Sequence, residues 1–380
     1  MRLGLWAGAA ATGAIGWSGR FEHLPIAALV LVLWRWSRSR LEALGVGAAY
    51  YGAASVGWIP ASSRFFGSES GPSRTAILIW LGAAALLALP WGFLWSEQFA
   101  VSAVSRLVRG AALGLVLMVP PLGLVSWSNP WVAGAALLPG LGCFGFGLLT
   151  LSVFAPGARS WPGWLAVFFV VSAVACARHE PVAHRDWVGV STRYGRLTEV
   201  GVEARYDRAI SSGQVAARTG AKVVLFPEGG GGRWTPSGAA LWEAQAAESG
   251  RVLFVGALQA REGVRRNGLG IAGEGEAGFW PQRLPAPLGM WAPWRPEHVR
   301  SDLFGSSVAD ILGHRVAMLV CFEQFVSWPA LQSAVEGAEI VFAPANLWFA
   351  RGTNLSAVRD VTLQSWAALM GWSVVEAING

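Results

Sequence analysis

The sequence has a single lysine, Lys222, among 380 residues, and no aspartate before Arg178. The formal net charge of +6 therefore comes almost entirely from arginine, and the arginines are scattered along the chain. Nucleic-acid-binding proteins usually gather basic residues in a patch or stripe, so we expect no nucleic-acid partner. The three cysteines, Cys143, Cys176 and Cys321, are too few and too widely spaced for a disulfide framework or a zinc site. We expect no metal and no other cofactor.

Charged residues are also scarce, at 14% of the chain, and their distribution is uneven. Hydrophobic residues make up 53%, and the mean hydropathy of +0.43 is high for a soluble protein. Charges are sparse up to Arg178 and frequent after it. This change in composition predicts two domains, a transmembrane domain over residues 1–178 and a globular domain over residues 186–380.

The apolar first part contains seven candidate spans, although a buried soluble helix is the alternative for each of them. A membrane-spanning helix needs roughly 20 apolar residues. Arginine is concentrated in the even-numbered loops, for example Arg38, Arg40 and Arg109, which predicts that these loops are cytoplasmic. Seven spans then place the globular domain in the periplasm of a bacterium, with the phospholipid inner membrane as a partner. The candidate spans are Leu3–Trp17, His23–Trp36, Leu41–Ile59, Thr75–Trp95, Val101–Trp127, Trp131–Phe154 and Trp161–Ala177.

Strand-like and helix-like segments alternate after Arg178, which predicts an α/β fold. Active sites in such folds lie where strands end, and three expected strands end in polar or thiol side chains, at Glu228, Cys321 and Asn346. The expected strands are Trp187–Arg193, Ala221–Glu228, Arg251–Leu258, Val316–Glu323 and Ala338–Asn346. The expected helices are Val202–Thr219, Pro236–Ser249, Trp328–Val335 and Ala357–Met370.

Glu228 and Cys321 each allow two interpretations. Glu228 is either a solvated loop acid or a carboxyl group whose pKa is raised by apolar neighbours, so that it acts as a general base. Cys321 is either a buried structural thiol or a nucleophile that needs a base and oxyanion donors nearby. Glu323 lies two residues after Cys321, so in an extended segment it points to the same side and can orient groups in the site.

Five motifs in order make the second part resemble the nitrilase, or carbon–nitrogen hydrolase, superfamily. That family uses a glutamate, a lysine and a cysteine on an α-β-β-α sandwich. The resemblance implies that Glu228 in "VVLFPEG" is the base, that Cys321 in "CFE" is the nucleophile, and that Glu323, Asn267 and Asn346 support them. The other motifs are "RRNG" at Asn267, "NLWFARGT" from Asn346 and "VEAING" from Val375.

A membrane domain before a nitrilase-like domain narrows the resemblance to two families. One is apolipoprotein N-acyltransferase, which moves an acyl chain from phospholipid to a lipoprotein through a thioester. The other is the conjugal transfer protein TraB family, which "QRLPAPLGMWAPW" (Gln282–Trp294) and "LQSWAALMGW" (Leu363–Trp372) resemble more closely. These resemblances imply cysteine-dependent acyl transfer or amide hydrolysis, and a lipoprotein or a conjugation-apparatus protein as partner.

The sequence departs from the nitrilase pattern at the lysine. Aligning Pro287–Met290 with the family's Pro-Phe-Gly-Glu segment puts Gln282 at the lysine position, with Arg283 beside it. Three interpretations stay open: Arg283 replaces the lysine, a residual activity persists, or the domain is an inactive scaffold. The sequence also stops at Asn379-Gly380, earlier than the nitrilase family leads us to expect. Two interpretations stay open: the nitrilase-like domain is incomplete at its C-terminal end, or the TraB-like plan has a shorter domain.

Overall fold

The computed structural model describes residues 3–68, 71–97, 102–155, 157, 159–180, 183–196, 202–273 and 278–380. The chain forms two compact units. The first unit comprises Met1–Pro181 together with Phe325–Ala334 and Gly352–Trp372, and the second comprises Val182–Gln324, Val335–Arg351 and Ser373–Gly380. Two segments from late in the sequence therefore belong to the first unit.

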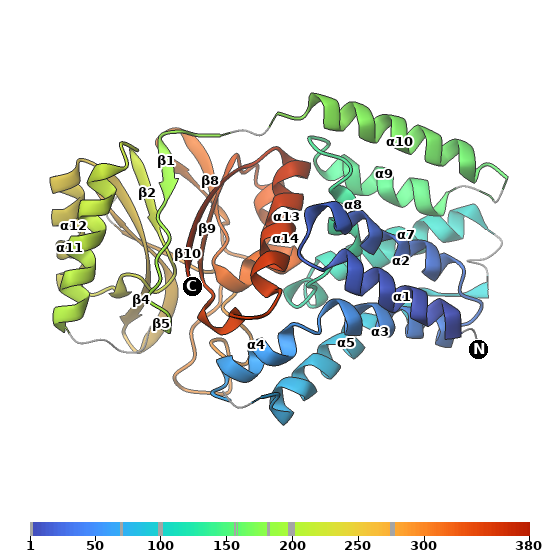
Figure 1. The fold of residues 1–380 in the computed structure, drawn as a ribbon, viewed down its shortest axis with the longest axis horizontal. Helices are drawn as coiled ribbons and strands as arrows, with labels where there is room; N and C mark the ends of the chain where they lie inside the picture. The colour runs from blue at the N-terminus through green and yellow to red at the C-terminus, as the bar shows by residue number, and fades with distance from the viewer. Residues whose placement is uncertain are drawn as a thin grey trace. The chain divides into compact units, whose positions relative to one another are not determined.

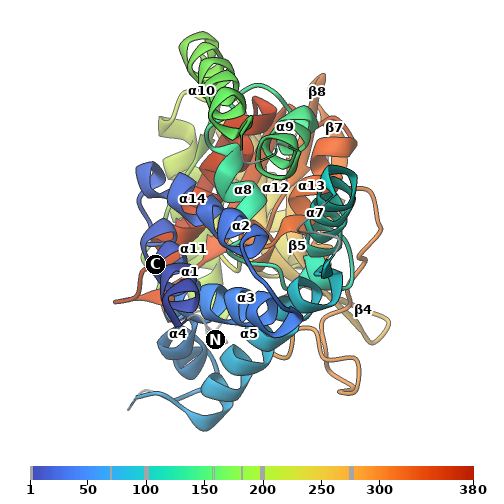
Figure 2. The same cartoon turned by 90° about the vertical axis from the view of Figure 1, so that its right-hand side faces the viewer.

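The first unit is helical (Figure 2), and its core contains several buried aromatic side chains. Helices α1, α3 and α5 pack side by side, and glycines allow their close approach, because a Cβ at Gly13 would lie 2.5 Å from the carbonyl oxygen of Tyr50. Trp34, Trp91 and Tyr50 are fully buried. The helices are α1 (Leu3–Gly16), α2 (Leu24–Arg35), α3 (Arg40–Ala54), α4 (Trp58–Phe65), α5 (Arg74–Leu94), α7 (Ala103–Met118), α8 (Pro130–Ala135), α9 (Cys143–Phe154), α10 (Trp161–Arg178), α13 (Ser327–Val335) and α14 (Leu355–Met370).

Several expected spans are interrupted in the structure. The segment expected to span from Val101, which itself lies outside the described residues, gives α7, and this helix ends before the Pro120-Pro121 pair. The segment 131–154 divides into α8 and α9 around Gly140 and Gly142, which both have positive φ. Within the described part of the chain, α5 with 21 residues and α10 with 18 are long and apolar enough to cross a membrane. The seven-span domain stays a prediction.

The second unit contains two β-sheets that pack face to face (Figure 1). In the first sheet, β1, β2 and β4 are parallel, β5 and β6 continue it antiparallel, and β3 pairs with β4. In the second, β10, β9 and β8 are parallel and β7 is antiparallel. The strands are β1 (Trp187–Gly189), β2 (Val223–Phe226), β3 (Gly232–Arg233), β4 (Val252–Arg261), β5 (Val264–Ala272), β6 (Gly278–Pro281), β7 (Val308–Ile311), β8 (His314–Met318), β9 (Ile340–Asn346) and β10 (Ser373–Asn379).

Both faces of the first sheet are apolar, which explains the continuous hydrophobic run of β2. One face packs against the second sheet through residues such as Leu225, Phe254 and Phe342. The other face is covered by α11 (Val202–Arg218) and α12 (Pro236–Ser249) (Figure 1). Phe226 of β2 packs against Trp242 of α12 there. The expected α/β class is confirmed, and one helical layer and both sheets of the predicted sandwich lie within this unit.

Candidate active site

Four strands of the second unit deliver polar or thiol side chains at or just after their carboxyl ends. Glu228 follows β2 after one proline, and Cys321 begins a short 3₁₀ helix, η3 (Cys321–Gln324), three residues after β8. Asn346 and Asn379 are the last residues of the neighbouring strands β9 and β10. Parallel strands bring their carboxyl ends to one edge of a sheet, which is where α/β proteins hold ligands.

The carboxyl group of Glu228 is buried and lies at the centre of the site. Its Oε1 accepts a hydrogen bond of 2.7 Å from Asn267 Nδ2. The side chain of Cys321 and the backbone of Asn346 also hydrogen-bond to this carboxyl group. Burial raises the pKa of Glu228, and these three hydrogen bonds oppose the increase. A carboxyl group of this kind, in contact with a thiol, is equipped to accept the thiol proton.

Cys321 occupies an uncommon backbone conformation. Its φ of +49° lies in the left-handed region. This conformation destabilises a residue other than glycine by on the order of 1–3 kcal/mol, and residues that adopt it cluster at functional sites. The thiol is half-buried, and Sγ lies 3.9 Å from the carbonyl oxygen of Asn346. The strained turn holds the sulfur beside Glu228 at the end of the sheet.

Gln282 is joined to Glu228 through Asn267. It follows β6 and continues the pairing with β5, because its backbone N–H donates to the carbonyl oxygen of Asn267 at 2.7 Å. Its Oε1 accepts a bond of 2.7 Å from Asn267 Nδ2, so that Asn267 donates to both Glu228 and Gln282. Gln282 Nε2 donates to the carbonyl oxygens of Leu284 (3.1 Å) and Val320 (2.9 Å). Both amide groups therefore use both of their N–H bonds within the protein.

Arg283 lies in a separate buried cluster with Glu323. Its Nη2 donates to the carbonyl oxygen of Met318 at 3.1 Å, and its Nε lies 4.0 Å from Glu323 Oε1. Glu323 is fully buried and accepts from the backbone N–H groups of Arg283, Leu284 and Val320 at 2.7–3.1 Å. Burial raises the pKa of Glu323, and the Arg283 guanidinium and the three N–H groups oppose this. The pair fastens the segment after β6 to the turn after β8.

The position of Glu323 corrects one expectation. An extended segment would place Glu323 on the same side as Cys321, but residues Cys321–Gln324 form a 3₁₀ turn. The turn directs the Glu323 carboxylate toward backbone N–H groups, where it supports the loop that carries Gln282 and Arg283. The contacts described for Arg283 connect it to this support, and its predicted role at an oxyanion stays a prediction.

Two further residues contribute to the site: Gln324, which the sequence motifs did not single out, and Asn379, which was recognised only as part of the "VEAING" motif. Gln324 is buried, and its Nε2 donates to the carbonyl oxygens of Leu319 and Pro344, which fixes the turn to β9. Asn379 Nδ2 donates to Asn346 Oδ1 at 2.8 Å, and its Oδ1 accepts from Thr192 and from the backbone of Tyr194. The sequence signal for Gln324 was its place in "CFEQF", where two polar residues stand between two phenylalanines.

The raised pKa of Glu228 predicts a pH-dependent effect of Glu228→Gln on stability. The wild-type carboxyl group loses its proton less readily in the folded than in the unfolded chain, where the pKa is about 4.3. Its contribution to folding is thus complete below that value and falls as the pH rises through the folded pKa. Glutamine does not titrate, so Glu228→Gln should gain thermal stability relative to the wild type as the pH rises from 5 to 8. The measurement is the difference between the two unfolding midpoints, taken on the full chain in detergent.

Glu262→Gln is the matched control for this measurement, because the Glu262 side chain is 83% exposed. It makes the same chemical change where no burial acts on the carboxyl group. A difference between Glu228→Gln and wild type that stays constant between pH 5 and pH 8 would contradict the assignment of a raised pKa.

Comparisons with known proteins give matches to two curated sequences over nearly the whole chain, whereas no family model matches. "Conjugal transfer protein TraB" from Agrobacterium fabrum is 31% identical over 386 residues, covering 97% of this chain and 90% of the relative. "Probable conjugal transfer protein TraB" from Sinorhizobium fredii is 29% identical over 380 residues, with 97% and 95% covered.

Solved structures of the nitrilase superfamily match about half of the chain. A variant of the amidase from Nesterenkonia AN1 aligns with a TM-score of 0.39 and 15% identity, over 51% of this chain and 74% of the amidase. A carbon–nitrogen hydrolase from Helicobacter pylori aligns with a TM-score of 0.41 and 14% identity, over 52% and 75%.

Proposed function

Because the chain belongs to the TraB family of conjugal transfer proteins, we propose that it acts in conjugal plasmid transfer as a membrane component with a cysteine site. In this proposal, Glu228 is the base and Cys321 is the nucleophile for acyl transfer or amide hydrolysis. The observation that carries the proposal is the hydrogen bond between the Cys321 side chain and the buried Glu228 carboxyl group. A buried base that contacts a thiol at a strand end is the arrangement that nucleophilic catalysis requires.

The chemistry proceeds in two steps. The Glu228 carboxylate accepts the thiol proton while Cys321 Sγ attacks the carbonyl carbon of an ester or amide. The C–O or C–N bond then breaks, Glu228 returns the proton to the departing alcohol or amine, and a thioester remains on Cys321. Water or an amine attacks the thioester in the second step, which gives hydrolysis or acyl transfer and regenerates the thiol. A membrane phospholipid is the acyl donor, and a lipoprotein or a protein of the conjugation apparatus is the acceptor.

A second candidate function is a binding component that does not react. It is favoured by Gln282, which lies where the nitrilase resemblance places the lysine, because both N–H bonds of its amide are used by Leu284 and Val320. The side chain thus offers no additional donor for a developing oxyanion, and losing one such donor typically costs about 10²–10³ in rate. In this candidate, the second unit serves as a scaffold surface for another conjugation protein.

Membrane insertion is proposed from the outer surfaces of α5 and α10. Both helices expose large apolar side chains, including Leu78 and Phe93 on α5 and Phe169 and Val170 on α10. Surfaces of this kind mark contacts with membranes or proteins, and α5, with 21 residues at ~1.5 Å per residue, matches the thickness of the hydrocarbon core. We therefore place the first unit in the inner membrane.

The second unit is proposed to lie in the periplasm, because the arginine-rich loops of the first unit are cytoplasmic by the positive-inside rule. A reporter fused after Gly380 is expected to be active only as a periplasmic reporter. A matched fusion of the same reporter after Arg38, in the arginine-rich loop between α2 and α3, should give the opposite signal. A cytoplasmic signal from the fusion after Gly380 would overturn this orientation.

Plasmid transfer distinguishes the reactive site from the scaffold. Donor cells that lack the gene are complemented with wild type, with Cys321→Ala, or with Cys176→Ala as a matched control at an exposed cysteine. The reactive site predicts that Cys321→Ala leaves transfer at the level of the uncomplemented strain, while Cys176→Ala restores it, with equal protein amounts on immunoblots. Full transfer with Cys321→Ala would favour the scaffold, and wild-type transfer without the gene would contradict a role in conjugation.

A further inference from the structure

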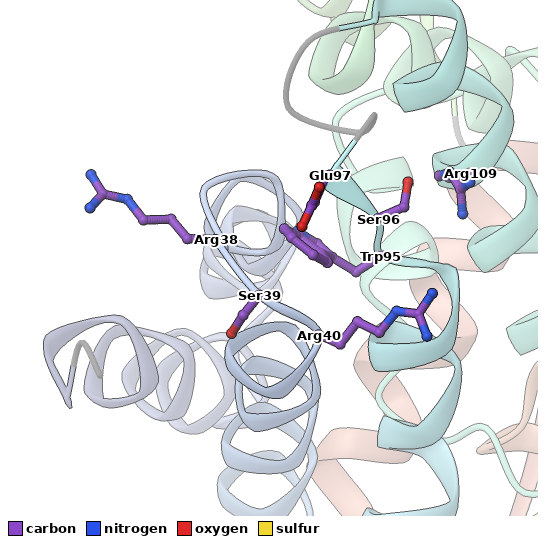
Figure 3. Close-up of a pocket in the computed structure, with 7 residues that line it drawn as sticks. All are labelled: Arg38, Ser39, Arg40, Trp95, Ser96, Glu97 and Arg109. Carbon is purple, nitrogen blue, oxygen red and sulfur yellow. The ribbon is translucent and has the colours of Figure 1, made fainter.

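A second candidate site lies in the first unit, in an open cavity of about 640 Å³ (Figure 3). The cavity lies between the start of α3 and the segment that follows α5, and Arg109 of α7 also lines it. It shares no residue with the cysteine site, and the inference drawn from it does not rest on the function proposed above. Its lining residues are Arg38, Ser39, Arg40, Trp95, Ser96, Glu97 and Arg109.

The lining is cationic, with three arginines and one glutamate. In Figure 3, the side chains of Arg40 and Arg109 extend to the same side of Trp95, whereas that of Arg38 extends away from them. Arg109 is held in place, because its Nε donates to Ser105 Oγ at 3.1 Å and its Nη1 to the carbonyl oxygen of Leu94 at 2.9 Å. These two bonds leave Arg109 Nη2 without an acceptor within the described part of the chain, and the same holds for the Arg40 guanidinium.

Two further donors point to an anionic ligand. Ser96 Oγ is buried and has no hydrogen-bond partner among the residues described in the structure, and such a group usually has one. Helix α3, with 15 residues, begins at Arg40, and its N-cap Ser39 accepts from the backbone N–H of Glu42. The remaining first-turn N–H groups of a helix and its macrodipole favour an anion at this end. The Glu42 carboxylate in the same turn accepts a hydrogen bond from the backbone N–H of Arg38 and is therefore turned toward the residues that precede the helix.

From these groups we infer that the cavity binds a phosphate group between Arg40, Arg109 and Ser96. Guanidinium groups bind phosphate oxygens through paired N–H bonds, which suits them to phosphate more than to a monatomic anion. The hydroxyl of Ser96 supplies a third donor. The phosphate belongs either to a phospholipid headgroup or to a soluble phosphate ester, since both present the same oxygens.

The test titrates the detergent-purified full chain with dihexanoyl phosphatidylglycerol, glycerol 3-phosphate, inorganic phosphate, and dihexanoylglycerol as the phosphate-free control. Native mass spectrometry or calorimetry gives the dissociation constants. Charge-assisted hydrogen bonds contribute about 1.5–3 kcal/mol, so Arg40→Gln and Arg109→Gln are each expected to weaken phosphate binding by about 10- to 100-fold. Arg20→Gln, which removes the same charge from an exposed side chain outside the cavity lining, should change binding less than about threefold.

The outcomes separate the two sources of phosphate. Tighter binding of the lipid than of glycerol 3-phosphate, with loss in Arg40→Gln, supports a lipid headgroup. Equal binding of the two, with the same loss, supports a soluble phosphate ester. The inference is overturned if dihexanoylglycerol binds as tightly as its phosphate-bearing counterpart, or if Arg20→Gln weakens binding as much as Arg40→Gln. Ser96→Ala keeps the test interpretable if the arginine variants misfold, because it removes one donor without changing the charge.

Discussion

Replacing Glu228 with glutamine is expected to slow the acylation of Cys321 by about 10²- to 10⁴-fold, the usual contribution of a positioned general base. The carboxyl group hydrogen-bonds with the Cys321 side chain and lies in a buried environment. Glutamine keeps the shape and can still accept from Asn267, but it cannot accept the thiol proton. The loss should therefore appear in the rate of reaction rather than in the position of the thiol.

The measurement uses a p-nitrophenyl ester as acyl donor and peptide mass spectrometry to quantify each cysteine separately. Cys143 and Cys176 are exposed and act as internal standards whose acylation should not change. Glu262→Gln removes an exposed carboxylate and should react like wild type. If Glu228→Gln acylates Cys321 at the wild-type rate, Glu228 is not the base.

Restoring a lysine at position 282 is expected to accelerate acylation of Cys321 by about 10²- to 10³-fold, the effect of one oxyanion donor. Gln282 Nε2 already donates to Leu284 and Val320. An ammonium group has three donors, so two can replace those bonds and the third remains for the oxyanion. The substituted lysine would also lie close to Asn267, which contacts Glu228.

Gln282→Met is the control for this variant, because it has a similar length and no donor. We expect Gln282→Met to remain at or below the wild-type rate, so that any gain can be ascribed to the ammonium group. If Gln282→Lys folds, by an unchanged thermal transition, and reacts no faster than Gln282→Met, the missing donor does not limit the site. Arg283 would then be the better candidate for stabilising the oxyanion.

The α/β class of the second unit was predictable because its buried strands are long apolar runs. "VVLF" at β2 and "IVFAPAN" at β9 have this pattern, and α12 extends over Pro236–Ser249 as expected. Strand β5 was missed because Arg265 and Arg266 break the apolar pattern of a strand that is only partly buried at its start. The lengths of the first unit's helices were overestimated where proline and glycine interrupt apolar segments.

The convergence of the expected site residues was predictable from the sequence, but the directions in which their side chains point were less so. Glu228, Asn267, Cys321 and Asn346 converge as the motif order implied. Neighbouring side chains of an extended segment point to opposite sides, so Gln282 faces Asn267 while Arg283 lies beside Glu323. At the sequence level, its positive charge made Arg283 the candidate to replace the family lysine. The sequence could not show that the Arg283 side chain lies beside Glu323 instead. The turn that begins at Cys321 depends on a positive φ, which a cysteine rarely adopts.

The intact mass of the full chain after incubation with phospholipid bilayers tests the reactive cysteine most directly. We predict an increase by one acyl chain, located on Cys321 by peptide mapping, removed by hydroxylamine and absent from Cys321→Ala. An unchanged mass with phospholipids of several headgroups, or equal acylation of wild type and Cys321→Ala, would contradict the proposed thioester.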